Sequence, residues 1–210
     1  MENQFREEMV AFGASLFNRG FSSGSGGNMS VKLPDGTFLA TPTNSSLGRL
    51  VPDRLARVAS DGTLLSGLPP SKECAFHLKI YEARPECGAV VHLHSTYATA
   101  LASLRDINEE DVIRPVTPYY AMKVSPLPLV PYYKPGSSEL VAAIAATARV
   151  AKCMLLANHG PVVTGATLED AVNTAEELEE TAKLVFLLQG NPLGVRYLAE
   201  SQVWELIAKK

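Results

Sequence analysis

The chain has 210 residues, of which 46% are hydrophobic and 20% are charged, and its formal net charge at pH 7 is -3. A chain of this length suits one domain whose core is large enough to be stable without disulfides. The slightly negative charge and the scattered basic residues argue against a protein that binds nucleic acid or an anionic membrane.

Cysteine usage and the N-terminus indicate the compartment. Cys74, Cys87 and Cys153 lack the number and spacing of a disulfide framework or a zinc ribbon, so we expect free thiols in a reducing compartment. The N-terminal residues are polar and acidic, which is unlike a signal peptide. No apolar run approaches the roughly 18 residues of a membrane-spanning helix. These features predict a cytoplasmic protein.

The N-terminal part of the chain predicts a helix, two hairpins and a second helix. Apolar residues recur at helical steps in the first segment, and Gly20 follows as a C-terminal cap. A glycine-rich stretch leads into the first hairpin, and the second is centred on Asp61-Gly62. Ser71 can cap the second helix. The expected ranges are 2–19, 29–41, 56–65 and 71–83.

The rest of the chain predicts alternating strands and helices. A strand at 90–94 feeds a helix at 96–104, whereas the proline-rich stretch 112–136 is typical of loops with short edge strands. Further on we expect a helix, a strand–turn–strand unit and a long helix from Thr167 that ends near Gly190; the tail from Asn191 is uninformative. The helix spans 138–149 and the strand unit 153–163. The sequence therefore predicts one α/β domain over residues 1–210, with a mainly antiparallel central sheet flanked by helices.

His92 and His94 are the strongest candidates for metal ligands. Side chains alternate across the two faces of a strand, so both rings should point the same way. By itself the pair can equally reflect packing or chance. His159, at the end of an apolar run, and Glu73, near the start of a predicted helix, can complete the site. Three histidines with an open fourth position are typical of catalytic zinc rather than structural zinc.

Neighbouring segments can bind an anion. If Ser71 caps a helix, the free N–H groups and the positive end of the dipole point toward a ligand there. Lys72 adds a charge, although it can also be an ordinary solvated lysine. The stretch 24–28 can form an anion nest with Asn28 or be a flexible turn. Glu73 can serve as an acid or base beside the metal, or only favour the helix dipole.

Three further residues have less specific signals. His77 lies one turn beyond Glu73, and we expect it to pack or hydrogen-bond on its helix face rather than bind metal. Tyrosines in proline-rich loops usually pack, so at most one near Tyr119 is expected to be catalytic. Cys74 has no evident basic partner, which favours inert burial.

Five motifs, in this order and at these intervals, resemble the class II aldolase/adducin-head family over roughly residues 5–190. They are Gly27-Asn28, Thr41-Pro42-Thr43, Pro70-Ser71-Lys72-Glu73, His92-Leu93-His94 and Asn158-His159-Gly160. The resemblance implies an α/β fold and a zinc site formed by His92, His94 and His159, with Glu73 as resting ligand and acid/base. The phosphate-binding segments of the family map to Asn28, Met29, Thr43, Asn44, Ser71 and Lys72. Family members are commonly homotetramers whose active sites lie between subunits.

The segments at 43–49 and 70–73 are most similar to the branch of 3-oxo-tetronate 4-phosphate decarboxylases. Sugar-phosphate aldolases usually have Thr-Gly in place of Thr43-Asn44 and Ser-Ser in place of Ser71-Lys72. The resemblance thus implies a zinc lyase that converts a small phosphorylated sugar acid to dihydroxyacetone phosphate and carbon dioxide through an enediolate. Mn²⁺ or Co²⁺ also suits imidazole ligands.

Two other functions stay open. The first is a class II aldolase of the fuculose-phosphate type, which cleaves a ketose 1-phosphate through the same enediolate, with Tyr119 as a candidate proton donor. The second is a non-catalytic interaction module like the adducin head, which lacks the metal ligands that this sequence keeps.

Overall fold

The computed structural model describes residues 2–208, and its centre is an eight-stranded sheet of order β4-β3-β2-β1-β5-β8-β7-β6. Neighbouring strands are antiparallel except β6 and β7, which are parallel. The predicted α/β fold with a mainly antiparallel sheet is therefore confirmed. The strands are β1 (Asn28–Lys32), β2 (Phe38–Ala40), β3 (Ala56–Val58), β4 (Leu64–Ser66), β5 (Ala89–His92), β6 (Leu129–Val130), β7 (Cys153–Leu156) and β8 (Gly160–Gly165).

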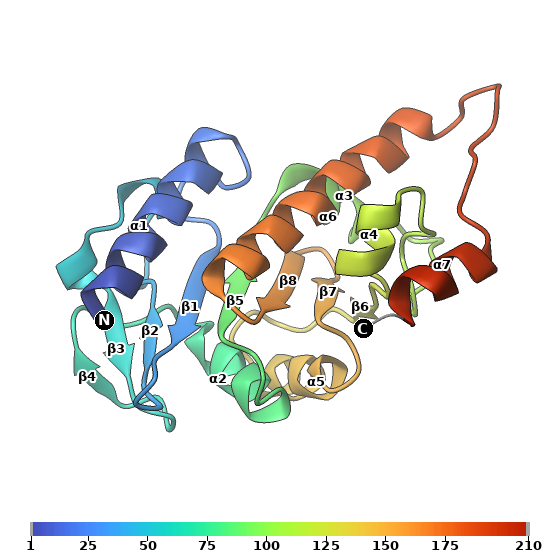
Figure 1. Cartoon of the computed structure of the whole chain (residues 1–210). Helices are drawn as coiled ribbons and strands as arrows, with labels where there is room; N and C mark the ends of the chain where they lie inside the picture. The colour runs from blue at the N-terminus through green and yellow to red at the C-terminus, as the bar shows by residue number, and fades with distance from the viewer. Residues whose placement is uncertain (1, 209–210) are drawn as a thin grey trace.

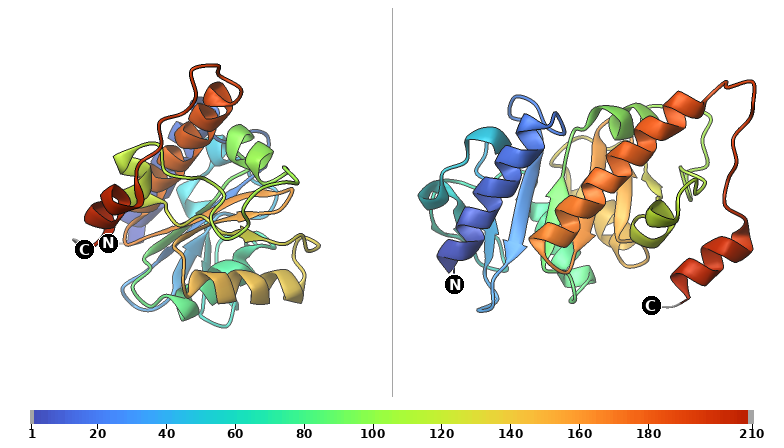
Figure 2. Two further views of the ribbon diagram at one scale, coloured as in Figure 1. Left: turned by 90° about the vertical axis from the view of Figure 1, so that its right-hand side faces the viewer. Right: turned by 45° about the horizontal axis from the view of Figure 1, so that its top comes forward.

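Helices cover both faces of this sheet (Figures 1 and 2). In Figure 1, α1 and α6 lie above the strands, and α2 and α5 lie below them. The α-helices are α1 (Glu2–Asn18), α2 (Cys74–Ala83), α3 (Thr96–Leu101), α4 (Pro118–Lys123), α5 (Ser138–Ala148), α6 (Leu168–Leu188) and α7 (Glu200–Ile207). Two 3-10 turns, η1 (Leu47–Arg49) and η2 (Pro52–Arg54), follow β2.

The central strands β5 and β7 are mainly apolar because helices pack against both faces of the sheet. In β7, Cys153 and Leu155 belong to the core beneath α1 and α6, whereas Met154 and Leu156 belong to the core beside α2 and α5. This alternation divides the hydrophobic interior into two layers. Burying one large aliphatic side chain in either layer is worth about 1.5–3 kcal/mol relative to exposure.

Three predicted element boundaries were wrong. Helix α2 begins at Cys74 with Glu73 at its N-cap position, so Ser71 is not the cap; its Oγ accepts a hydrogen bond from the Glu73 N–H at 3.3 Å. Helix α3 ends at Leu101, earlier than predicted. Strand β5 ends at His92, so His94 lies beyond the strand.

Two helices were not predicted. Helix α4 lies in the proline-rich stretch 112–136, which was predicted to form loops, and α7 lies in the tail after Asn191. Thr117 and Pro118 supply the start of α4, because the Thr117 hydroxyl accepts from the Tyr120 N–H at 3.1 Å and proline is favoured in the first turn. Both helices are too short for hydrophobic periodicity to identify them.

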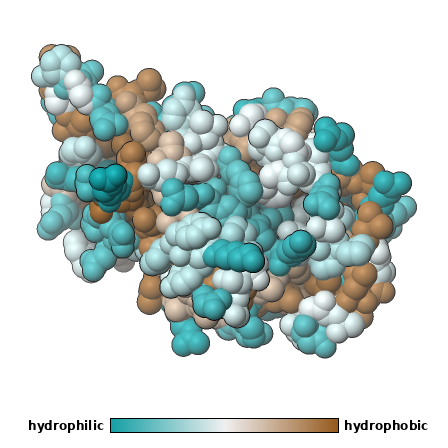
Figure 3. Space-filling model, turned by 180° about the vertical axis from the view of Figure 1, so that it is seen from behind, coloured by the Kyte–Doolittle hydropathy of each residue, from teal (hydrophilic) through white to brown (hydrophobic). Residues whose placement is uncertain are grey.

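The surface of the face opposite to that of Figure 1 mixes hydrophilic and hydrophobic residues. Figure 3 shows the face opposite to that of Figure 1, where the middle is mainly hydrophilic to neutral and hydrophobic residues are more prominent toward the edges. Among residues 2–208, none of the helices combines the length and apolar character needed to cross a bilayer.

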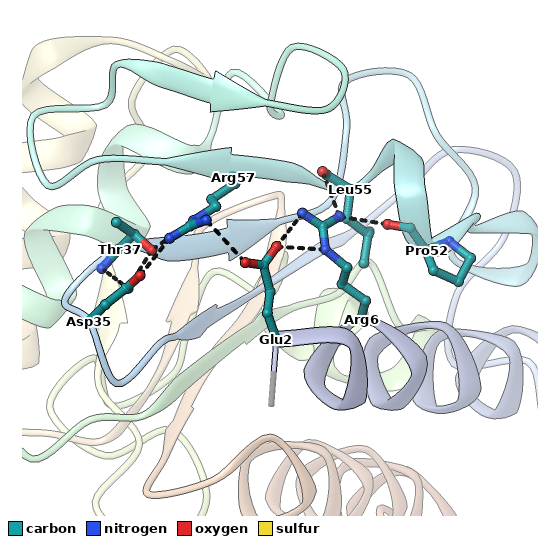
Figure 4. Close-up of polar contacts among 7 residues, drawn as sticks. All are labelled: Glu2, Arg6, Asp35, Thr37, Pro52, Leu55 and Arg57. Atoms are coloured by element: carbon teal, nitrogen blue, oxygen red, sulfur yellow. Dashed lines mark hydrogen bonds and ion pairs between the residues drawn. The ribbon is translucent and has the colours of Figure 1, made fainter.

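A buried arginine joins α1 to the η2 turn (Figure 4). Arg6 is 8% exposed, and its Nη1 donates to the carbonyl oxygens of Pro52 at 2.7 Å and Leu55 at 3.2 Å. Glu2 accepts from Arg6 Nε and Nη2 at 2.8 and 2.6 Å, and its second oxygen lies 3.1 Å from Arg57 Nη1. The guanidinium thus pairs with a charge and satisfies two backbone acceptors that the helix would otherwise cover.

We expect Arg6→Met to lower the free energy of unfolding by about 1–3 kcal/mol, because two carbonyl groups lose their donor. Urea denaturation followed by circular dichroism measures this loss. The matched control is Arg19→Met, since Arg19 is half-exposed and pairs with Glu176 at the surface; that change should cost less than about 1 kcal/mol. Equal losses in the two variants would contradict the role assigned to the Arg6 contacts.

Candidate functional site

The site forms where the central strands end. In the β1–β5 pair Asn28 lies opposite His92, and in the β5–β8 pair His92 lies opposite Val162. Strand β8 begins directly after His159, and α2 begins directly after Glu73. Antiparallel pairing therefore gathers the start of β1, the end of β5 and the start of β8 at one edge of the sheet.

Three histidines and one glutamate converge there. His92 Nε2 lies 3.1 Å from His94 Nε2 and 3.4 Å from Glu73 Oε2. His159 Nε2 lies 3.4 Å from Glu73 Oε1, and one donor atom from each of the four residues lies within 4.8 Å of all the others. In a tetrahedral zinc site with bonds of 2.0–2.1 Å, neighbouring donor atoms are about 3.4 Å apart. The donor set and its spacing fit a divalent metal.

His94 joins this cluster although it lies outside the strand. The prediction that the two histidines share one strand was wrong, but the prediction that their rings face the same side is confirmed by the 3.1 Å contact. The three rings form a nearly equilateral triangle, with centroids 4.8–4.9 Å apart.

Two glycines allow the backbone to approach the end of β5 closely. Gly27 has φ +79°, and a Cβ there would lie 2.8 Å from the His92 carbonyl oxygen. Gly160 has φ +152°, and a Cβ there would lie 2.3 Å from the Leu93 carbonyl oxygen. Both positions favour glycine for conformation as well as for space.

Hydrogen bonding and burial keep the ring of His92, and burial that of His94, in a state that suits metal binding. His92 Nδ1 donates to the Pro161 carbonyl oxygen at 2.8 Å, which leaves the lone pair of Nε2 directed at the cluster. Burial, with smaller effects from His159 and His94, holds the pKa of His92 well below its usual value. Burial also lowers the pKa of His94. Neutral rings do not have to lose a proton before they bind a metal.

Asn28 and His77 form a second layer behind Glu73. Asn28 Nδ2 donates to Glu73 Oε2 at 2.7 Å, and Asn28 Oδ1 lies 2.6 Å from His77 Nε2. The expectation that His77 packs and hydrogen-bonds is confirmed, because its ring stacks on Phe76 and also contacts Ser30. Burial lowers the pKa of His77 to about 3, so the ring is neutral.

An open cleft of about 490 Å³ adjoins the cluster. Most of the residues proposed from the sequence line it, namely Asn28, Thr43, Asn44, Ser71, Lys72, Glu73, His94 and His159. Ser25, Gly27, Pro42 and Ser45, which lie in the segments singled out from the sequence, also line it. Two lining residues lie outside those segments, namely Pro135 and Gly136. The last two come from the loop after β6, where turn residues gave no sign of a ligand site.

Met29 and Tyr119 do not line this cleft. Met29 points to the opposite face of β1 from Asn28, is fully buried, and donates its N–H to Thr41 Oγ1 at 3.1 Å, so it has no free polar group to offer a phosphate. Tyr119 lies on α4 and is 63% exposed. Cys74, beside Glu73, is buried, and burial raises its pKa to about 11, in agreement with an inert thiol.

We expect the chain to bind one divalent ion, and His159→Ala to weaken that binding at least about 100-fold, because the loss of a ligand exceeds the 10–100-fold effect of an outer partner. Competition with a chromophoric chelator measures the affinity. Tyr119→Phe is the control and should bind as the unsubstituted protein does. Equal affinities for His159→Ala and this control would remove His159 from the site.

Three comparisons with known proteins agree with this geometry. Residues 7–186 match the family described as Class II Aldolase and Adducin N-terminal domain. The chain is 52% identical to 3-oxo-tetronate 4-phosphate decarboxylase of Escherichia coli strain K12, over 98% of this chain and 96% of that protein. Its structure resembles that of YgbL from Escherichia coli (TM-score 0.95, 51% identity, 98% of each chain) and an L-fuculose 1-phosphate aldolase (TM-score 0.87, 26% identity, 97% and 94%). The chain belongs to the class II aldolase and adducin N-terminal domain family.

Proposed function

We propose that this chain is a carbon–carbon lyase that decarboxylates a 3-oxo-tetronate 4-phosphate to dihydroxyacetone phosphate and carbon dioxide. The observation that carries this proposal is the convergence of His92, His94, His159 and Glu73 on one point at the wall of a polar cleft. The name of the 52% identical relative supports the choice of substrate.

We assign the metal site to the three histidines, with Glu73 as a fourth ligand at rest and zinc as the metal. Imidazole and carboxylate ligands at these spacings suit zinc, and they also suit Mn²⁺ and Co²⁺. When bound, a divalent cation supplies Lewis-acid stabilisation of the negative charge that develops as carbon dioxide leaves.

Glu73 is the proposed acid. In the substrate the ketone is β to the carboxylate, so breaking the bond between C1 and C2 moves an electron pair into an enediolate. Protonation at C2 then gives dihydroxyacetone phosphate, and Glu73, which is a carboxylate at rest, would take that proton from solvent and donate it to C2. Asn28 donates to Oε2, and Oε1 lies on the side of His159. Such positioned proton transfer accelerates reactions by about 10²–10⁴-fold.

The polar residues of the cleft are assigned to the substrate's anionic groups. Asn28, Thr43, Asn44 and Ser71 would hold the phosphate, and Lys72 would pair with the phosphate or with the carboxylate before it leaves. The support for this assignment is their shared position in the cleft.

Assembly and compartment complete the proposal. We assign a homotetramer with active sites between subunits, by resemblance to the family, and the cytoplasm as the compartment. The three cysteines are buried and unpaired, which suits a reducing environment. The exposed ring of Tyr119 is a candidate to reach a neighbouring subunit's site.

A class II aldolase is the second candidate. It is favoured by the similarity to L-fuculose 1-phosphate aldolase, with a TM-score of 0.87. Retro-aldol cleavage passes through the same enediolate, so the metal and Glu73 would serve both reactions. Lys72 is the feature that favours the decarboxylase, because a cation beside the metal suits a substrate that carries both a phosphate and a carboxylate.

We expect the metal-loaded protein to release carbon dioxide and dihydroxyacetone phosphate from a 3-oxo-tetronate 4-phosphate. A coupled assay for dihydroxyacetone phosphate, run beside a carbon dioxide assay, measures both products. L-Fuculose 1-phosphate serves as the competing substrate. Aldehyde production from that compound without carbon dioxide from the sugar acid would replace the decarboxylase with the aldolase, and inactivity toward both would favour an interaction module.

Glu73→Gln should lower kcat by about 10²–10⁴-fold, because the amide keeps the shape of the side chain but cannot donate the proton. The metal should stay largely bound, since the three histidines are intact, and elemental analysis verifies this. Lys79→Met is a matched control on the same helix, where Lys79 is exposed and pairs with Glu82. Full activity in Glu73→Gln would remove Glu73 from the mechanism.

A further inference from the structure

A row of hydrogen bonds leads from the interior between α2 and β1 to Glu73. Tyr81 OH lies 2.9 Å from Ser30 Oγ, which lies 2.7 Å from His77 Nδ1. His77 Nε2 lies 2.6 Å from Asn28 Oδ1, and Asn28 Nδ2 donates to Glu73 Oε2 at 2.7 Å. The proposed function uses the last two residues and gives no role to the other three.

Two sequence spacings build this row. Glu73, His77 and Tyr81 are four residues apart and therefore share one face of α2. Asn28 and Ser30 are two residues apart and share one face of β1. The four residues other than Glu73 are each at most 6% exposed, so water does not compete for these bonds.

The donor and the acceptor of each hydrogen bond in the row can be assigned by starting from Glu73. A carboxylate only accepts, so the amide nitrogen of Asn28 faces Glu73 and the amide oxygen faces His77. That oxygen needs a donor, so His77 carries its proton on Nε2, and the neutral ring accepts at Nδ1. Ser30 must donate its single proton to Nδ1, and Tyr81 must therefore donate to Ser30.

We propose that His77 is a positioning residue, which fixes the amide of Asn28 in the orientation that donates to Glu73. Without the His77 ring, the side-chain amide of Asn28 can rotate by 180° and place its oxygen against the Glu73 carboxylate. The two oxygens carry partial or full negative charge and repel each other. The carboxylate that is a metal ligand at rest and the proposed acid then loses the contact that orients it. This inference rests on the role proposed for Glu73 and extends it to a buried residue that touches neither metal nor substrate.

The test is a double-mutant cycle on metal affinity, measured by chelator competition with Zn²⁺ in the full chain. His77→Phe should weaken binding by about 10–100-fold, as is typical of outer partners of metal ligands. In an Asn28→Ala background the same substitution should change the affinity by no more than about twofold, because His77 acts through Asn28. Ile80→Val, at a buried position on the same helix outside the row, should bind as the unsubstituted protein does.

The same weakening in both backgrounds would assign His77 a merely structural role, and no weakening in either would also overturn the proposal. If the proposed activity holds, His77→Phe should lower kcat by about 10–100-fold while KM changes little. Metal affinity is measured without turnover, so a wrong substrate assignment leaves the outcome of the cycle intact.

A second measurement needs no substitution, which matters because His77→Phe leaves buried polar atoms without partners. Nitrogen-15 NMR of histidine-labelled protein identifies which ring nitrogen carries the proton. We expect His77 to be protonated on Nε2 only, with its N–H protected from exchange. A proton on Nδ1 would reverse the row and overturn the proposal.

Discussion

The antiparallel pairing of β1, β5 and β8 is the constraint on which the site depends. Register places Asn28 beside His92 and brings His159 to the same edge, so groups that are 131 positions apart in the printed numbering become neighbours. A shift of one residue in β5 would turn His92 to the opposite face of the sheet. The cores on both faces, one beneath α6 and one beside α2, resist such a shift because Ala89 and Val91 belong to the first core and Val90 to the second.

Much of this arrangement was accessible from the sequence, because it depends on local periodicity. Turn residues and a glycine-rich lead-in predicted the hairpins, and the steps of three and four predicted α1 and α6. The same reasoning failed where a tertiary contact overrides the local pattern. On α1, for example, Arg6 and Gly13 are buried while Phe5 and Phe12 are only partly so, since η1 and η2 press against that side of the helix.

The candidate site shows the same division. The histidines and Glu73 could be selected from their residue types and from the family resemblance, yet Met29 was grouped with Asn28 although adjacent strand residues face opposite ways. The spacings of His77, Tyr81 and Ser30 were present in the sequence. What the sequence alone did not reveal is that β1 packs against α2, which is a long-range contact that no local spacing encodes.

Gly27 and Gly160 have a consequence for how this scaffold can change. Both glycines lie in close contact with the backbone at the end of β5, so larger residues at these two positions would displace the segments that carry the histidines. Asn44 and Lys72, by contrast, have exposed side chains that belong to neither core. Substitutions at these two positions can therefore change which substrate is bound, while the metal-binding residues stay the same.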